Sequence, residues 1–135
     1  MPISIDLSSI KRVTLASPPT QPPPCHRCGQ VSERLVTRSS NRNGNAGRPY
    51  YKCLRCNKFL VFADYRGNDP TNPECHCGCS SKLQITGMSK WVAGRLHYVC
   101  RLGSCDFFSP TKDANGLDIV IDMGLAEDLS RLSIV

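Results

Sequence analysis

The sequence predicts a small β-rich protein whose fold depends on bound metal, and two observations lead to this prediction. A motif bounded by cysteines occurs twice within 135 residues, and aromatic residues make up only 7% of the chain. Each repeat is about forty residues long, a size at which an apolar core alone rarely offsets the entropy of the chain. The nine cysteines must therefore supply stability, through metal ions or through disulfides.

The two repeats carry glycine, arginine, tyrosine and cysteine at matched positions. The first run is GRPYYKC at residues 47–53, and the second is GRLHYVC at residues 94–100. A close cysteine pair followed by glycine precedes each run. One more cysteine and a phenylalanine follow it, Cys56 with Phe59 and Cys105 with Phe108. We therefore predict two copies of one unit.

Composition divides the chain into five segments. Residues 1–24 are rich in serine, threonine and proline and predict a disordered or extended segment, with a weak strand signal at Ile3, Ile5 and Leu7. The first unit spans 25–66, a turn-forming connector 67–74 and the second unit 75–110. The tail, 111–135, is acidic and apolar. It predicts a short strand at Leu117, Ile119 and Ile121 and a helix with an apolar stripe at Leu125, Leu129 and Leu132.

Alternating apolar residues predict three strands in each unit. The ranges are 31–37, 48–54 and 58–63 in the first unit, and 82–87, 95–100 and 106–109 in the second. The step from Asn43 to Gly44 is a strong turn signal between the first two strands. Tyr50 and Tyr51 are neighbours in one strand, so we expect one of them in the core and the other exposed.

The cellular compartment decides whether the cysteines form disulfides or bind metal. Residues 1–16 interrupt every apolar residue with a polar one, whereas a secretory signal needs roughly seven to fifteen continuous apolar residues. No apolar run approaches the length of a membrane span. We therefore expect an intracellular, nuclear protein, and in a reducing setting closely paired cysteines indicate zinc.

Two sets of four cysteines predict two Zn²⁺ ions. Structural zinc takes four ligands, and two of them can lie a few residues apart on one tight turn. The first set is Cys25, Cys28, Cys53 and Cys56, and the second is Cys75, Cys77, Cys100 and Cys105. In the second set, Cys79 and His76 remain possible substitutes. We expect the glycine after each first pair, Gly29 and Gly78, to turn with positive φ and to aim its amide at a thiolate sulfur.

These motifs resemble the GRF-type zinc finger, a small zinc ribbon found in DNA repair nucleases, glycosylases, topoisomerases and helicase-like proteins. The resemblance covers residues 25–66 and 75–110 as two tandem zinc ribbons, similar to stand-alone fungal members of the family. It implies zinc binding by four residues, binding of single-stranded DNA in several members, and a nucleic-acid contact at Arg48 and Arg95. The usual tryptophan after the last ligand is absent from both copies, and His97 replaces an aromatic residue.

Charge favours nucleic acid as the partner. Residues 25–66 carry a net charge of +7 and residues 75–112 a net charge of +4, whereas residues 113–135 carry −4. Basic residues neutralise phosphates, and the rings of Tyr50, Tyr51, Phe59 and Phe62 offer faces for unpaired bases. We expect a single-stranded DNA or RNA partner, bound with little sequence specificity. The candidate contacts are Arg38, Arg42, Arg48, Tyr50, Lys52, Arg55, Lys58 and Arg95.

Alternatives remain open at this stage. Arg48 and Arg95 could instead brace the fold, and the aromatic residues could fill a small core. Residues 113–135 could bind a protein partner and make the chain an interaction adaptor, or could fold back onto the two units. We expect no enzymatic activity, because four cysteines can fill each metal site and no nucleophile with a base, phosphate loop or carboxylate pair is visible.

Overall fold

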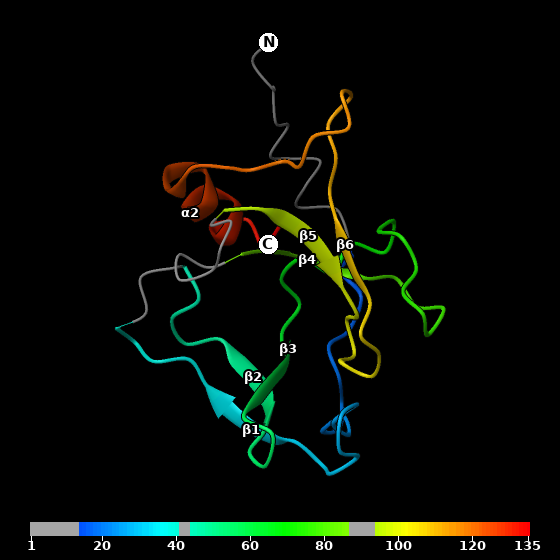
Figure 1. Ribbon diagram of the computed structural model, residues 1–135. Helices are drawn as coiled ribbons and strands as arrows, with labels where there is room; N and C mark the ends of the chain where they lie inside the picture. The colour runs from blue at the N-terminus through cyan, green and yellow to red at the C-terminus, as the bar shows by residue number, and fades with distance from the viewer. Residues whose placement is uncertain (1–13, 41–43, 87–93) are drawn as a thin grey trace.

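The computed structural model describes residues 14–40, 44–86 and 94–135. It contains two three-stranded antiparallel sheets and a short C-terminal helix, which confirms the predicted β-rich fold (Figure 1). The first sheet has the order β1-β2-β3, with β1 (Glu33–Val36), β2 (Pro49–Cys53) and β3 (Lys58–Phe62). The second has the order β4-β5-β6, with β4 (Lys82–Ile85), β5 (Leu96–Val99) and β6 (Phe108–Pro110).

Each observed strand overlaps a range predicted from the sequence. Three predictions fall outside the described residues: the strand signal at residues 3–7, the candidate contact Arg42, and Asn43 of the turn signal. None of the helices among the described residues is long and apolar enough to cross a membrane.

A β-bulge shapes the first ribbon, residues 25–66. Tyr51 pairs with Val61 and Lys52 pairs with Phe59, so Leu60 is an extra residue in β3. In a regular strand without the bulge, Phe59 and Phe62 would face opposite sides of the sheet. The bulge instead brings both phenylalanines of β3 to one face of the ribbon. Leu60 and Val61 are both buried beside Tyr51 and form the small core.

The adjacent tyrosines of β2 confirm the predicted alternation. Tyr51 is 6% exposed and belongs to the core, whereas Tyr50 is half-buried and lies on the opposite face. Strand alternation thus assigns one tyrosine to the fold and leaves the other at the surface.

The connector packs between the two ribbons. Gly67 has a φ of +77°, and a Cβ at this position would lie 2.0 Å from the carbonyl oxygen of Leu83. Asn68 is fully buried, and its side-chain amide donates to the carbonyl oxygens of Ala16 at 2.9 Å and Asp64 at 3.0 Å. The connector therefore joins the ribbons through direct contacts.

The first half of the tail returns to residues 94–96, at the start of β5. The amide of Leu96 donates to Ile119 at 2.9 Å, and the amide of Ile121 donates to Gly94 at 3.0 Å. The predicted strand in this region forms only single bridges, one of which joins Arg95 and Val120. The prediction of a regular strand is therefore wrong, because the returning chain pairs only at isolated positions, with Arg95 just before β5 and with Lys112 of the tail itself.

The second half of the tail forms helix α2 (Met123–Arg131), beside the second sheet (Figure 1). Asp122 caps the helix by accepting a hydrogen bond from the Leu125 amide at 2.8 Å. Leu129 is 9% exposed, and the Gly67 amide donates to Ser133 at 2.9 Å. The tail therefore folds back onto the connector and buries Leu129, while Leu125 of the same stripe stays 40% exposed.

Candidate metal centres and nucleic-acid interface

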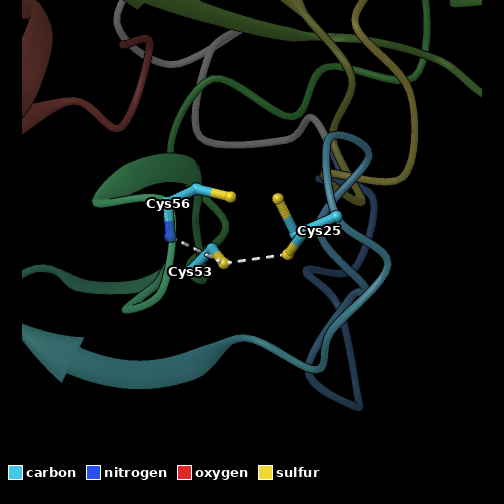
Figure 2. A group of neighbouring side chains, drawn as sticks. Cys25, Cys53 and Cys56 are labelled. Atoms are coloured by element: carbon cyan, nitrogen blue, oxygen red, sulfur yellow. Dashed lines mark hydrogen bonds between the residues drawn. The ribbon is translucent and has the colours of Figure 1, made fainter.

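The first metal centre joins a loop to the β2–β3 turn. The Sγ atoms of Cys25, Cys28, Cys53 and Cys56 lie within 4.8 Å of one another, and Cys28 and Cys53 are 3.5 Å apart. Figure 2 shows Cys25 pointing from its loop toward Cys53 and Cys56. Tetrahedral zinc with bonds of about 2.3 Å separates its sulfur ligands by about 3.8 Å. The cluster therefore suits one Zn²⁺ ion.

The second centre has the same construction. The Sγ atoms of Cys75, Cys77, Cys100 and Cys105 lie within 4.8 Å of one another, with 3.8 Å between Cys75 and Cys100. Cys79 does not belong to this cluster of described residues. His76 is exposed and lies 3.8 Å from a carboxylate oxygen of Asp106. The second cluster suits another Zn²⁺ ion, so the chain offers two zinc sites.

Backbone amides support the thiolates of both centres. Arg27 donates its amide to the Sγ of Cys25, and Cys77 donates to the Sγ of Cys75, each at 3.4 Å. Backbone hydrogen bonding, from Cys28 above all, lowers the pKa of the Cys25 thiol to about 6. At Cys25 this environment favours the deprotonated sulfur that metal binding requires, whereas burial raises the pKa of the Cys75 thiol to about 12.

The glycines after the first cysteine pairs close the turns in a different way from that expected. Gly29 and Gly78 have φ values of +76° and +79°, as predicted. Their amides, however, donate to the carbonyl oxygens of Cys25 at 2.6 Å and Cys75 at 3.0 Å. The expectation that these glycine amides bond the sulfurs is therefore wrong, because each is used to close its own turn.

An aromatic groove of ≈ 590 Å³ lies on the first ribbon. Tyr50 stacks on Phe59 with 5.6 Å between ring centroids and an interplanar angle of 29°. Phe62 meets Phe59 edge-on at 4.9 Å, and Phe59 remains 41% exposed. The groove is lined by Leu35, Val36, Thr37, Arg38, Ser40, Asn45, Tyr50, Lys52, Asn57, Phe59 and Phe62.

Arg48 lies inside the ribbon and braces this face. Its Nε and Nη2 atoms donate to the two carboxylate oxygens of Asp64 at 2.7 and 2.9 Å. Its Nη1 atom donates to Asn45 at 3.0 Å, and the guanidinium carbon lies 3.8 Å from the ring centroid of Phe62. Arg48 is only 5% exposed. The structure therefore places this arginine in a bracing position with little exposed surface.

Asp64 is shared between the two ribbons. Burial alone would raise the pKa of Asp64, but hydrogen bonds and charge from Arg48 and Lys82 hold it at about 2. Lys82 is fully buried at the start of β4. Sequence reasoning missed both Asp64 and Lys82, because isolated charged residues are expected at the surface. No local signal in the sequence could have paired them.

The other predicted contacts differ in their surroundings. Arg38 and Arg55 are exposed, and Lys52 and Lys58 are half-buried; of these four, Arg38 and Lys52 line the groove. Arg95, in the second ribbon, lies 3.3 Å from Asp118 of the tail. The groove therefore brings together Arg38, Tyr50 and Lys52 from the predicted set.

The second ribbon carries a reduced version of the aromatic face. His97 stacks on Phe108 with 4.7 Å between ring centroids and an angle of 30°, as Tyr50 does on Phe59. His97 is 4% exposed, and burial lowers its pKa. Pro110 pairs with His97 in the sheet. The second face therefore has two stacked rings and a proline in place of the third.

The match to one family model agrees with the geometry of the first ribbon. Residues 22–66 match the family model of the GRF-like zinc ribbon domain. A comparison with curated proteins gives no match. The crystal structure of the human NEIL3 tandem zinc finger GRF domains is 23% identical and covers 66% of this chain and 97% of that chain, with a TM-score of 0.26. Residues 22–66 of the chain are therefore a GRF-like zinc ribbon, and the second four-cysteine unit repeats its strand order.

Proposed function

We propose that the groove of the first ribbon binds single-stranded nucleic acid with little sequence specificity. The observation that carries this proposal is the grouping of Tyr50, Phe59 and Phe62 on one accessible face. Every base has a flat face, so stacking on aromatic rings tolerates any sequence. Bases within a duplex already stack on each other and cannot reach the rings, which favours an unpaired strand.

Charge around the groove supports the same proposal. Arg38 and Lys52 border the rings, and the first ribbon carries a net charge of +7. Neutralising phosphates with such residues releases counterions and makes affinity fall as salt rises. We therefore expect binding that combines stacking with a clear salt dependence.

The metal centres support a binding module in place of an enzyme. Each cluster offers four thiolate ligands, which fill the tetrahedral coordination of structural zinc and leave no position for a substrate. The alternative of an adaptor surface on the tail has less support, since Ala126 and Leu129 are buried within the chain, although Leu117, Val120 and Leu125 are exposed.

Removing one ring of the groove tests the proposal. Phe59→Ala should weaken binding of labelled oligothymidine by about 1–3 kcal/mol, because a stacking face is lost. Tyr65→Ala is the matched control: Tyr65 is 54% exposed in the same ribbon but does not line the groove. Fluorescence anisotropy at low and high salt, with a duplex of the same length for comparison, provides the measurement. The proposal fails if wild-type protein binds no single strand at low salt, or if the two variants behave alike.

A further inference from the structure

We infer that Lys82, in the second ribbon, is a positioning residue for the base-stacking face of the first ribbon. This inference rests on the proposed function, since it concerns the same groove. Lys82 itself is fully buried and cannot touch a bound strand. Its effect must therefore pass through other residues.

The ammonium group of Lys82 is held by acceptors from the end of the first ribbon and from the connector. Its Nζ donates to the Asp64 carboxylate at 2.9 Å, to the carbonyl oxygens of Asp64 and Arg66 at 3.0 and 2.6 Å, and to the Asn68 side chain at 3.2 Å. A buried charge is tolerated only when it is paired and fully hydrogen-bonded. Lys82 meets this condition, and in doing so it ties β4 to the segment that follows β3.

The contact continues from Asp64 to the groove. The Asp64 oxygen that accepts from Lys82 also accepts from Nη2 of Arg48, and the other oxygen accepts from Nε. This two-point contact fixes the plane of the guanidinium group. The guanidinium lies 3.8 Å from the ring centroid of Phe62, which lines the groove. Lys82, Asp64, Arg48 and Phe62 therefore form one continuous set of contacts.

The second ribbon provides a natural control with the same chemistry. Arg95 pairs there with Asp118, which also binds Lys112. Asp118 is 29% exposed and Lys112 52% exposed, against 18% and 0% for Asp64 and Lys82. The Arg95 guanidinium lies 5.5 Å from the Phe108 centroid. Because solvent can replace the Lys112 contact, its loss should have little effect.

Removal of the Lys82 amine should loosen the base-stacking face of the first ribbon without unfolding either ribbon. Asp64 would keep its ion pair with Arg48 but lose the one with Lys82, and the carbonyl oxygen of Arg66 and the Asn68 oxygen would lose the Lys82 donor. Arg48 and Phe62 could then leave the geometry that presents a flat ring to a base. Coupling of this kind through packed side chains should change the affinity of the groove for a nucleic-acid strand only modestly.

The test compares Lys82→Met with Lys112→Met in the full chain. Lys82→Met should retain two zinc ions and bind oligothymidine about three- to tenfold more weakly. The slope of log affinity against log salt should not change, because no phosphate contact is lost. Lys112→Met should bind within about twofold of wild type. Unchanged affinity in folded Lys82→Met, or a reduced salt slope, would overturn the inference.

A double-mutant cycle separates positioning from a general effect on stability. In a Phe62→Ala background, Lys82→Met should have almost no further effect on affinity, because the residue through which it acts is gone. Additive losses would contradict the inference. If zinc analysis shows that Lys82→Met does not fold, Lys82→Gln replaces it in the same cycle, because glutamine keeps hydrogen-bond donors. Additive losses with Phe62→Ala would again contradict the inference.

The aromatic NMR signals of Phe62 distinguish failure of this inference from failure of the proposed function. In the free protein, Lys82→Met should shift these signals and Lys112→Met should not. This result is expected even if the wild type binds no oligothymidine, in which case only the proposed function fails. Unchanged Phe62 signals in folded Lys82→Met would reject the positioning role itself.

Discussion

The two ribbons share a strand order and a four-cysteine cluster, yet they differ in what surrounds their repeated glycine and arginine. Around Gly47 of the first ribbon there is open space, whereas at Gly94 of the second a Cβ would lie 2.4 Å from the carbonyl oxygen of Ile121. The tail thus covers in the second ribbon a position that the first leaves free. The difference shows that one metal-stabilised scaffold can leave this position open or use it as a platform for packing.

The repeated arginine forms an ion pair with an aspartate in both ribbons. Arg48 pairs with Asp64, and Arg95 pairs with Asp118, so each arginine binds an aspartate that follows the last strand of its ribbon. Only the first pair is deeply buried and shared with a buried lysine. The arginine of the repeat therefore contributes mainly to bracing, and we propose that the aromatic residues decide which face binds.

Loss of one zinc ligand should have the largest effect and tests whether each ribbon depends on its own metal. Cys53→Ser should reduce bound zinc from two ions per chain to one and unfold the first ribbon, because zinc binding supplies about 10–16 kcal/mol in small zinc domains. Cys79→Ser is the control and should keep both ions, since Cys79 lies outside the second cluster. Metal analysis with circular dichroism checks both. Two ions retained in Cys53→Ser would contradict the assignment of the first site.

Alanine at the two repeated glycines should separate the covered ribbon from the open one. Gly94→Ala should destabilise the fold by about 2–4 kcal/mol, because a positive φ is strained and the new Cβ meets the Ile121 carbonyl. Gly47→Ala should cost about 1–2 kcal/mol, from backbone strain alone. Thermal unfolding monitored by circular dichroism compares them. Equal losses would mean that the tail does not pack closely on the second ribbon.

The smallest expected effect is a pH dependence of stability that arises in the second ribbon. Burial, opposed in part by a hydrogen bond to the Arg95 carbonyl, lowers the pKa of His97 below its unfolded value near 6.5. The unfolded chain then binds more protons, so stability should fall as the pH drops below about 6.5. The positive charge of Arg95 acts in the same direction as burial.

His97→Tyr introduces the residue of the first ribbon and should remove this pH dependence while keeping a ring against Phe108. Denaturant unfolding at pH values from 7 to about 5.5 in both proteins gives the comparison. Parallel curves for the variant and the wild type would show that His97 is not the group responsible.

Local spacing explains what the sequence could predict. Cysteine pairs on tight turns, the glycine after each pair and alternating apolar residues identify both metal sites and the approximate range of every strand. These features depend on residues close together in the chain. The separation of Tyr50 and Tyr51 onto opposite faces follows from the same short-range rule.

Long-range contacts explain what the sequence could not predict. The bulge at Leu60 reverses the alternation expected between Phe59 and Phe62, so the groove cannot be read from periodicity. The burial of Lys82 depends on Asp64, which lies in the other ribbon. Docking of the tail on the second ribbon likewise depends on pairing across the chain, which no local pattern reports.

We propose that the first ribbon, and not the second, presents the nucleic-acid-binding face. An NMR titration of isotope-labelled protein with oligothymidine tests it most directly. We predict that the signals of Tyr50, Lys52 and Phe59 shift in a salt-dependent manner while those of His97 and Phe108 stay in place. Shifts concentrated at His97 and Phe108, or no shifts at low salt, would contradict it.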